Sequence, residues 1–220
     1  MPPGSLPSLA DLYADVERYY TRKLAKHGPT ALGVDWSCVP TQELRFVQLL
    51  KVCDFNRPFS LTDLGCGYGA LLAFLAKRFR GNQVDYLGVD LSEAMIAEAC
   101  RLWAGHSRAD FVVGNAAPLA SDYTIASGIF NVKLHQPDGL WKQFVQTTLD
   151  EMREKSRRGF AVNFLAPLAM DAGPIELYRV ASQGWRDYCE RAFNAKVTLL
   201  DNYGMREYTL LIRLPHHTTC

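Results

Sequence analysis

The hydrophobic pattern at the start of the chain predicts an amphipathic helix. Apolar side chains recur at three- and four-residue intervals, which is typical of one buried helix face, at Leu9, Leu12, Val16, Tyr19 and Tyr20. We expect this helix to run to about Lys26, because Gly28 and Pro29 follow and neither residue continues a helix well.

A second helix is predicted after a loop that contains Gly33, Trp36 and Pro40. We expect it to begin near Thr41, whose hydroxyl group is suited to cap it. The residues expected on its apolar face are Leu44, Val47, Leu50 and Val52. Pro58 should end this N-terminal helical extension, residues 1–58, because proline interrupts a helix.

From residue 59 onward, strand-like and helix-like patterns alternate. The expected strands are 59–64, 85–90, 111–113, 123–130 and 159–165, followed by two apolar runs at 197–200 and 208–214. The expected helices are 70–80, 93–103 (capped by Ser92), 141–155 and about 175–193. Strands separated by helices pair in parallel through right-handed crossovers, which predicts an α/β fold with a doubly wound, mostly parallel seven-stranded sheet. The last two runs are too close for a crossover helix, so they should form an antiparallel hairpin at the end of the sheet.

Length and composition indicate one globular domain in which residues 59–220 form the core. The chain has 220 residues, with 24 Lys plus Arg against 23 Asp plus Glu. Such a balanced charge does not favour a nucleic acid or an anionic membrane as partner. The longest uncharged stretch, Leu64 to Ala76, is too short to span a bilayer. We expect a cytoplasmic protein with six reduced cysteines and no metal, since no Cys/His cluster has metal-ligand spacing.

The stretch DLGCGYG, residues 63–69, follows the first predicted strand and precedes its helix. Gly65, Gly67 and Gly69 let the backbone turn sharply and approach a ligand, at the sheet edge where open α/β folds bind ligands. A tight turn without a ligand is the alternative. However, Asp90 ends the next strand, where a carboxylate accepts hydrogen bonds from ribose hydroxyls. The spacing differs from the G-x-G-x-x-G pattern of dinucleotide sites, and the preceding Asp63 is better suited to a cationic group than to phosphates.

DLGCGYG followed by GVDLSEAMIAEA resembles motif I and the acidic second motif of class I S-adenosylmethionine (SAM)-dependent methyltransferases, and the resemblance extends from about Phe59 to Leu214. It implies a Rossmann-like fold with SAM as cofactor and S-adenosylhomocysteine (SAH) as product. The methionine end would contact Asp63, Gly65, Cys66, Gly67, Tyr68 and Gly69, and the ribose would contact Asp90. The adenine would lie between Leu91 and Met95, near Asn115 and the Ala116 N–H, and Ser127 to Phe130 would line the cleft beside the methyl group.

Several of these positions have a simpler structural interpretation. Asn115 stands where many members carry Asp, although an amide oxygen accepts the same bond from the adenine amino group. Met95 could fill the helix core, since Met commonly fills core gaps, and Asp90 could cap the following helix.

No catalytic residue is evident, because methyl transfer from a sulfonium depends mainly on alignment. Residues 19–36 combine Tyr19, Tyr20, His27 and Trp36 with Gly and Pro, which suits a lid over the site. Tyr20 and His27 are candidate bases. The alternative is that the two tyrosines pack the helix onto the sheet, Trp36 fills a surface groove and His27 is a solvated helix end.

Two later stretches offer further acceptor-site candidates. NVKLHQPDGLW follows the fourth strand and would place Asn131, Lys133 and His135 near the methyl group, with His135 as another candidate base. Tyr178 and Arg179 follow the fifth strand. The arginine could hold an acidic acceptor, or these stretches could be solvated and pair locally.

We therefore expect a SAM-dependent methyltransferase that acts on the oxygen or nitrogen of a small molecule. Two alternatives stay open. One is a non-catalytic relative that binds SAM or SAH, and the other is a nicotinamide-dependent oxidoreductase, which the glycine spacing disfavours.

Overall fold

The computed structural model describes residues 7–168 and 177–215. Its strands are β1 Phe59–Leu64, β2 Val84–Asp90, β3 Ala109–Val113, β4 Ser121–Ala126, β5 Ser156–Leu165, β6 Lys196–Leu200 and β7 Glu207–Arg213. Its α-helices are α1 Leu9–His27, α2 Val39–Leu49, α3 Ala70–Arg78, α4 Glu93–Leu102, α5 Asp138–Glu154 and α6 Ser182–Phe193, and short 3-10 helices cover Ala31–Val34 and Leu50–Val52.

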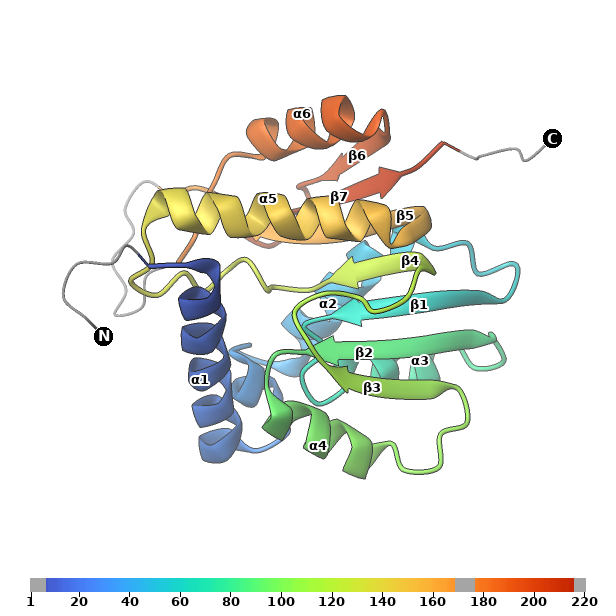
Figure 1. Cartoon of the computed structure of the whole chain (residues 1–220). Helices are drawn as coiled ribbons and strands as arrows, with labels where there is room; N and C mark the ends of the chain where they lie inside the picture. Colours follow the sequence, from blue (N-terminus) through green and yellow to red (C-terminus); the bar gives the residue numbers. More distant parts are fainter. Residues whose placement is uncertain (1–6, 169–176, 216–220) are drawn as a thin grey trace.

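The strands form one seven-stranded sheet in the order β3-β2-β1-β4-β5-β7-β6, which confirms the predicted fold class (Figure 1). The first five strands pair in parallel. β7 is antiparallel to both β5 and β6, as the close spacing of the last two runs predicts. It lies inside the sheet, so that β6 forms the edge.

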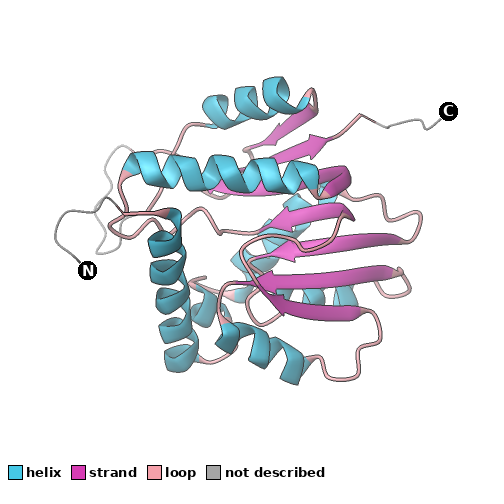
Figure 2. Ribbon diagram, viewed as in Figure 1, coloured by secondary structure: helices cyan, strands magenta, loops and turns pink. Residues whose placement is uncertain are grey.

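Two hydrophobic clusters cover the two faces of the sheet (Figure 2). On one face, Phe46 and Leu49 of α2 pack with Leu71 and Phe74 of α3 against the sheet. On the other face, apolar side chains of α1, α5 and α6 form the larger cluster, which includes Trp141. Helix α4 packs along β2 and β3 and also contacts α1.

Helix α1 crosses the sheet at the carboxyl ends of the parallel strands, where Figure 1 shows it nearly perpendicular to β1 and β2. A capping box at Ser8 and Asp11 begins the helix, and Gly28 at φ 64° ends it. Leu12 and Val16 are buried in the same hydrophobic cluster as α5, so α1 packs onto the domain. It reaches over the sheet edge at which ligands bind in this fold class.

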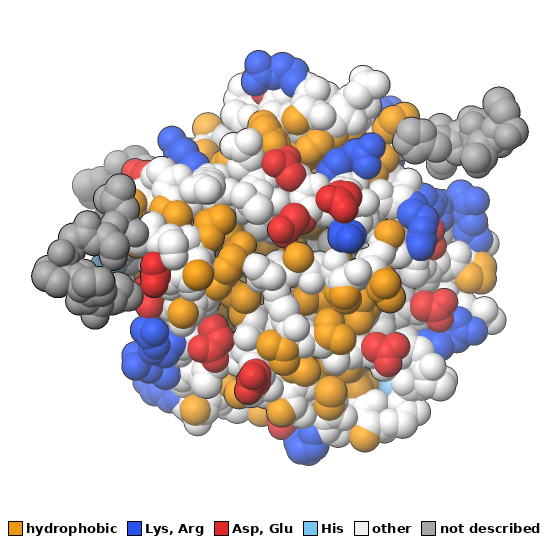
Figure 3. Space-filling view, viewed as in Figure 1, with side chains coloured by type: hydrophobic (Ala, Val, Ile, Leu, Met, Phe, Trp, Pro, Cys, Tyr) orange, Lys and Arg blue, Asp and Glu red, His pale blue; other side chains and the backbone are white. Residues whose placement is uncertain are grey.

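The connection from β3 to β4, residues 114–120, contains no helix. It passes in front of the sheet (Figure 1), although parallel strands usually need a crossover of a dozen or more residues. Val113 and Leu119 are 52% and 71% exposed. Figure 3 shows hydrophobic side chains over the middle of this face, with acidic and basic side chains interspersed around them.

The end of β4 and the start of α2 differ from the sequence prediction. β4 ends at Ala126 instead of residue 130, because Gly128 has φ 78° and takes the chain out of the strand. α2 begins at Val39, and the Thr41 hydroxyl donates to the Cys38 carbonyl from inside the helix instead of capping it. Leu50 and Val52 are buried as expected, although they lie in the short 3-10 helix that follows. Val47 is exposed, and the buried face of α2 carries Gln42, Arg45, Phe46 and Leu49.

Two more helices begin at other positions than predicted. α5 begins at Asp138, three residues before the expected Trp141. α6 begins at Ser182, and two isolated bridges, at Leu177 and Arg179, precede it. The expected start near Ile175 lies outside the described residues.

In the described ranges, no helix is long and apolar enough to cross a membrane, and no group of three His, Cys, Asp or Glu side chains is arranged to hold a metal. The five cysteines in these ranges are free thiols.

Candidate active site

The glycine loop connects β1 to α3 and forms one wall of a cavity at the carboxyl ends of the strands. Gly65, Gly67 and Gly69 all have positive φ, at 77°, 54° and 85°. The Gly65 and Cys66 amides donate to the carbonyl of Val89, which fixes the loop to the end of β2.

Neighbouring atoms leave no room for side chains at Gly65 and Gly69. A Cβ at Gly65 would lie 2.2 Å from Cγ2 of Ile129, and one at Gly69 would lie 2.6 Å from Nε1 of Trp103. Both the left-handed backbone and the close packing therefore require glycine. The contact with Ile129 brings the glycine loop against the segment that follows β4.

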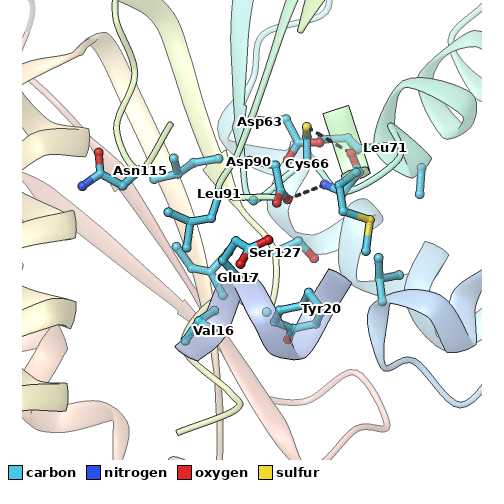
Figure 4. A pocket seen from close by; sticks show the side chains of 18 of the residues that line it. Val16, Glu17, Tyr20, Asp63, Cys66, Leu71, Asp90, Leu91, Asn115 and Ser127 are labelled. Atoms are coloured by element: carbon cyan, nitrogen blue, oxygen red, sulfur yellow. Dashed lines mark hydrogen bonds between the residues drawn. The ribbon is translucent and has the colours of Figure 1, made fainter. Parts of the chain in front are cut away.

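Asp90 closes β2 with its carboxylate facing the glycine loop (Figure 4). It accepts hydrogen bonds from the backbone amides of Gly67 at 2.8 Å and Ser92 at 2.9 Å. Burial raises the pKa of Asp90, these two bonds lower it, and the negative charge of Glu17 raises it again. The carboxylate oxygens have further acceptor capacity toward the cavity.

Asp63 lies deeper, at the base of the loop. Its side chain accepts a hydrogen bond of 2.6 Å from the Tyr86 hydroxyl. Burial raises the pKa of Asp63 to about 7, and the bond from Tyr86 only partly offsets this.

Helix α1 forms the opposite wall through a face made by Tyr13, Val16, Glu17 and Tyr20, which all line the cavity. Figure 4 shows Val16, Glu17 and Tyr20 on this helix. The Thr21 hydroxyl is 2.7 Å from both the Glu17 carboxylate and the Ser92 hydroxyl, so α1 is tied to the residues beside Asp90. At the other end of the face, burial raises the pKa of Tyr13, and a hydrogen bond with Asn115 partly offsets this.

A ring of contacts forms the wall at the end of β4. The Gly128 amide donates to Oδ1 of Asn163 at 2.8 Å, and Asn163 Nδ2 lies 3.5 Å from Glu207. Glu207 pairs with Arg45 at 2.7 Å.

The Arg45 guanidinium stacks over the Trp36 ring, 3.8 Å from its centroid. Trp36 in turn packs against Gly128, where a Cβ would lie 2.4 Å from the indole. The ring thus holds Trp36 against the cavity wall.

The cavity between these walls has a volume of about 100 Å³. Three carboxyl groups line it, from Glu17, Asp63 and Asp90, and none of the described residues that line it is Lys, Arg or His. The first turn of α3 also reaches the cavity at Ala70 and Leu71, and the first N–H groups of a helix have no partner within it. This donor set suits a ligand that carries positive charge, hydroxyl groups and one carboxylate.

Most of the predicted cofactor residues lie together here. The cavity is lined by Asp63, Gly65, Cys66, Gly67, Asp90, Leu91, Met95, Asn115 and Ser127, and, from the predicted acceptor residues, by Tyr20 and Trp36. Met95 is also buried in the helix core, and the Ser92 hydroxyl accepts from its amide, so Ser92 caps α4 as predicted.

Other predicted residues lie outside the cavity lining. Phe130 is in the core, stacked on Phe164 at 5.1 Å. Tyr68 points from the loop toward Gln42, with which it forms a hydrogen bond. Gly69 contacts Trp103, and Ala116 lies on the β3–β4 connection.

Most of the predicted acceptor residues and candidate bases also lie outside the cavity lining. Tyr19 donates to Asp35, and His27 is the last residue of α1. Lys133 pairs with Asp138 at 2.7 Å, while His135 is exposed. Tyr178 is buried and accepts from Trp185, and Arg179 donates to the Ala166 carbonyl.

Gly128 and Ile129 line the cavity, as expected for the stretch Ser127 to Phe130. Sequence reasoning missed the lining residues Tyr13, Val16, Glu17, Val34, Gln42, Phe46, Leu64, Ala70, Leu71, Gly114, Phe144 and Thr148. Only the α1 residues share a sequence pattern, since positions 13, 16, 17 and 20 lie on one helix face. The pattern does not distinguish a cavity lining from a buried core, because the core-facing stripe of the helix overlaps that face.

Comparisons with known proteins agree with this geometry. A family profile described as "Methyltransferase domain" matches residues 61–159. The chain is 39% identical over 166 residues to Rv1506c of Mycobacterium tuberculosis, a protein whose name assigns it to the methyltransferases; the match covers 74% of this chain and 98% of that protein.

Two solved structures share the fold. The magnesium protoporphyrin IX methyltransferase of Synechocystis PCC 6803, solved with bound SAH, has a TM-score of 0.66 at 16% identity, covering 93% of this chain and 100% of that one. Phosphoethanolamine N-methyltransferase 1 of Haemonchus contortus has a TM-score of 0.63 at 13% identity, covering 96% of this chain and 51% of that one. With the glycine loop, the acidic end of β2 and the sheet order described above, these matches show that the chain belongs to the class I SAM-dependent methyltransferases.

Proposed function

We propose that this chain transfers the methyl group of SAM to an oxygen or nitrogen atom of a small, uncharged molecule. The observation that carries this proposal is the cavity lining, in which the glycine loop and three carboxyl groups meet with no lysine, arginine or histidine among the described lining residues. SAM is a cation overall, and a cavity lined by acids stabilises a cation.

Each part of the cofactor has a matching group in the cavity. Asp90, which already orients two backbone amides, would accept from the ribose hydroxyls, and Leu91 and Met95 would flank the adenine. Asn115 would meet the adenine amino group. Asp63 and the glycine loop would hold the amino-acid end, with its carboxylate near the N–H groups that open α3.

The chain's own residues would contribute alignment and the exclusion of water. Bound SAM supplies a methyl group that its sulfonium already activates for in-line displacement, so no strong base is required. Tyr20 is the one candidate base that lines the cavity. Because burial raises its pKa further above the ordinary value, its hydroxyl stays protonated near neutral pH and would donate a hydrogen bond.

We assign α1 and the following loop the role of a lid. The volume of about 100 Å³ is smaller than the roughly 300–1,000 Å³ typical of ligand pockets, and α1 lies across the cavity. Movement of α1 away from Asp90 would admit SAM, and the Thr21–Ser92 contact would re-form on closure. Amide exchange in α1 should slow when SAH is added, and unchanged exchange there would contradict the lid.

The proposal is tested by titrating the chain with SAH in a calorimeter and then screening a metabolite extract for transfer from methyl-labelled SAM. Saturable SAH binding with label on a small molecule supports it, whereas NADH binding without SAH binding would contradict it.

A non-catalytic role as a SAM-binding relative is the second candidate. It would show SAH binding with no labelled product. The unpaired side-chain polar atoms of Ser127 and Asn131 favour an enzyme, because they could bind an acceptor.

A further inference from the structure

Three polar atoms just after β4 are buried without any hydrogen-bond partner. They are Oγ of Ser127 and both side-chain atoms, Nδ2 and Oδ1, of Asn131. Asn131 is only 4% exposed. Because an unmet buried donor or acceptor is destabilising, such groups in a native fold indicate a missing water or ligand.

Ser127 lies at the wall of the cavity, and Asn131 lies directly behind Gly128, next to the lining. Ser127 and Gly128 both line the cavity (Figure 4 labels Ser127). The backbone amide of Asn131 donates a hydrogen bond to the Gly128 carbonyl at 3.1 Å, which folds the segment into a turn. As a result, Nδ2 of Asn131 is 3.4 Å from the position of a Cβ on Gly128, beside the Trp36 indole.

A second buried asparagine at the same end of the sheet shows what a structural role looks like. Asn163 is fully buried, its Oδ1 accepts from the Gly128 amide, and its Nδ2 faces Glu207. The fold thus supplies partners for both atoms of Asn163 and for neither atom of Asn131.

We infer that Asn131, together with Ser127, is the hydrogen-bonding part of the acceptor site. The inference rests on the proposed methyltransferase function and names its acceptor class. A carboxamide offers a donor and an acceptor side by side, so it matches a planar group with the same pair, such as a hydroxyl or amino group beside a carbonyl. A carboxylate would leave Oδ1 without a donor and would meet no cation among the described lining residues.

The first experiment compares the melting temperatures of Asn131→Leu and Asn163→Leu in the full chain. Leu has nearly the shape of Asn and removes both polar atoms. Asn131→Leu should raise Tm by about 2–4 °C, because it deletes unmet groups, whereas Asn163→Leu should lower Tm, because it leaves the buried Gly128 amide without its acceptor and removes the contact with Glu207. A drop for Asn131→Leu similar to that for Asn163→Leu would overturn the inference.

The second experiment measures function on the same variant. SAH affinity of Asn131→Leu should stay within about twofold of wild type, since no cofactor group is assigned to Asn131. Methyl-labelled SAM is then incubated with a metabolite extract divided on ion-exchange resins into neutral and charged fractions. Wild type should label the neutral fraction, and Asn131→Leu should place about 10- to 100-fold less label in that fraction than wild type.

The outcomes separate the inference from the proposed function. Label confined to the anionic fraction, or full activity of Asn131→Leu, overturns the acceptor assignment while the methyltransferase function stands. Wild type that binds SAH but labels no fraction contradicts the proposed function, and the Tm comparison then still decides whether Asn131 is a binding group or a structural one.

Discussion

The two halves of the cavity treat their polar groups differently. In the half formed by β1 and β2, Asp63 and Asp90 already accept hydrogen bonds, from Tyr86 and from two backbone amides. In the half formed by the end of β4, Ser127 and Asn131 have buried atoms with no partner. The proposed function would explain the difference: the half that we assign to the cofactor is organised before its ligand arrives, whereas the half that we assign to the acceptor would be completed by its ligand.

The two halves meet where Gly65 faces Ile129, and a methyl group at that point should have the largest effect. Gly65→Ala should lower the free energy of unfolding by about 2–5 kcal/mol, the sum of a left-handed alanine and an overpacked contact. Urea unfolding would measure this. The double variant Gly65→Ala with Ile129→Ala should recover the packing part alone; no recovery would show that the contact with Ile129 is unimportant.

Asp63 should make the stability contributed by the cofactor half depend on pH. Its folded pKa of about 7 exceeds the ordinary 3.8, so the folded chain keeps a proton that the unfolded chain has lost between those values. The contribution to stability is therefore complete below about pH 4 and is lost as the pH rises through 7. Asp63→Asn should remove a change of up to about 4 kcal/mol across this range, from three pKa units at about 1.4 kcal/mol each. Parallel slopes for both proteins in unfolding measured from pH 4.5 to 8 would contradict this.

Asp90→Ala should weaken SAH binding by about 1–3 kcal/mol, because ribose hydroxyls lose a charged acceptor. The matched control is Asp85→Ala on the same strand, since Asp85 is exposed and pairs with Arg108 at the surface. Calorimetry should show normal affinity for the control. Equal losses in both variants would mean that the effect comes from net charge instead of ribose contact.

Glu17→Gln should have the smallest effect and should depend on the cofactor's charge. The carboxylate of Glu17 lines the cavity beside Asp90. Its neutralisation should weaken SAM binding about fivefold more than SAH binding, equivalent to about 1 kcal/mol, because only SAM carries the sulfonium charge. Equal changes for the two ligands would place Glu17 near groups that SAM and SAH share.

The contrast between the halves also explains what could be predicted from sequence. Gly65, Gly67 and Asp90 lie within two short segments whose spacing itself defines the loop and the strand end. Their placement in the cavity follows from local geometry and the alternation of strands and helices. Leu91 and Met95 were predicted from the resemblance to the methyltransferase family.

The acceptor half could not be predicted in this way. In the sequence, Asn131 and Asn163 are both flanked by apolar residues. Only the folded chain shows that the side chain of Asn163 has hydrogen-bond partners and that of Asn131 has none. Likewise, the cavity-facing role of Glu17 depends on where α1 docks, which its own periodicity does not determine. The predicted end of β4 was wrong for a related reason, since the positive φ angle of Gly128 ends the strand and a hydrophobic pattern contains no information on backbone angles.

The ring of contacts that holds Trp36 joins Arg45 to Glu207, two residues that are 162 positions apart. During synthesis, the glycine loop and both of its neighbouring strands leave the ribosome long before β7 does. A chain still being translated therefore possesses every residue of the cofactor half before the ion pair between Arg45 and Glu207, which supports Trp36, can form. Completion of the acceptor wall becomes a late event of folding, because contacts over such separations form slowly.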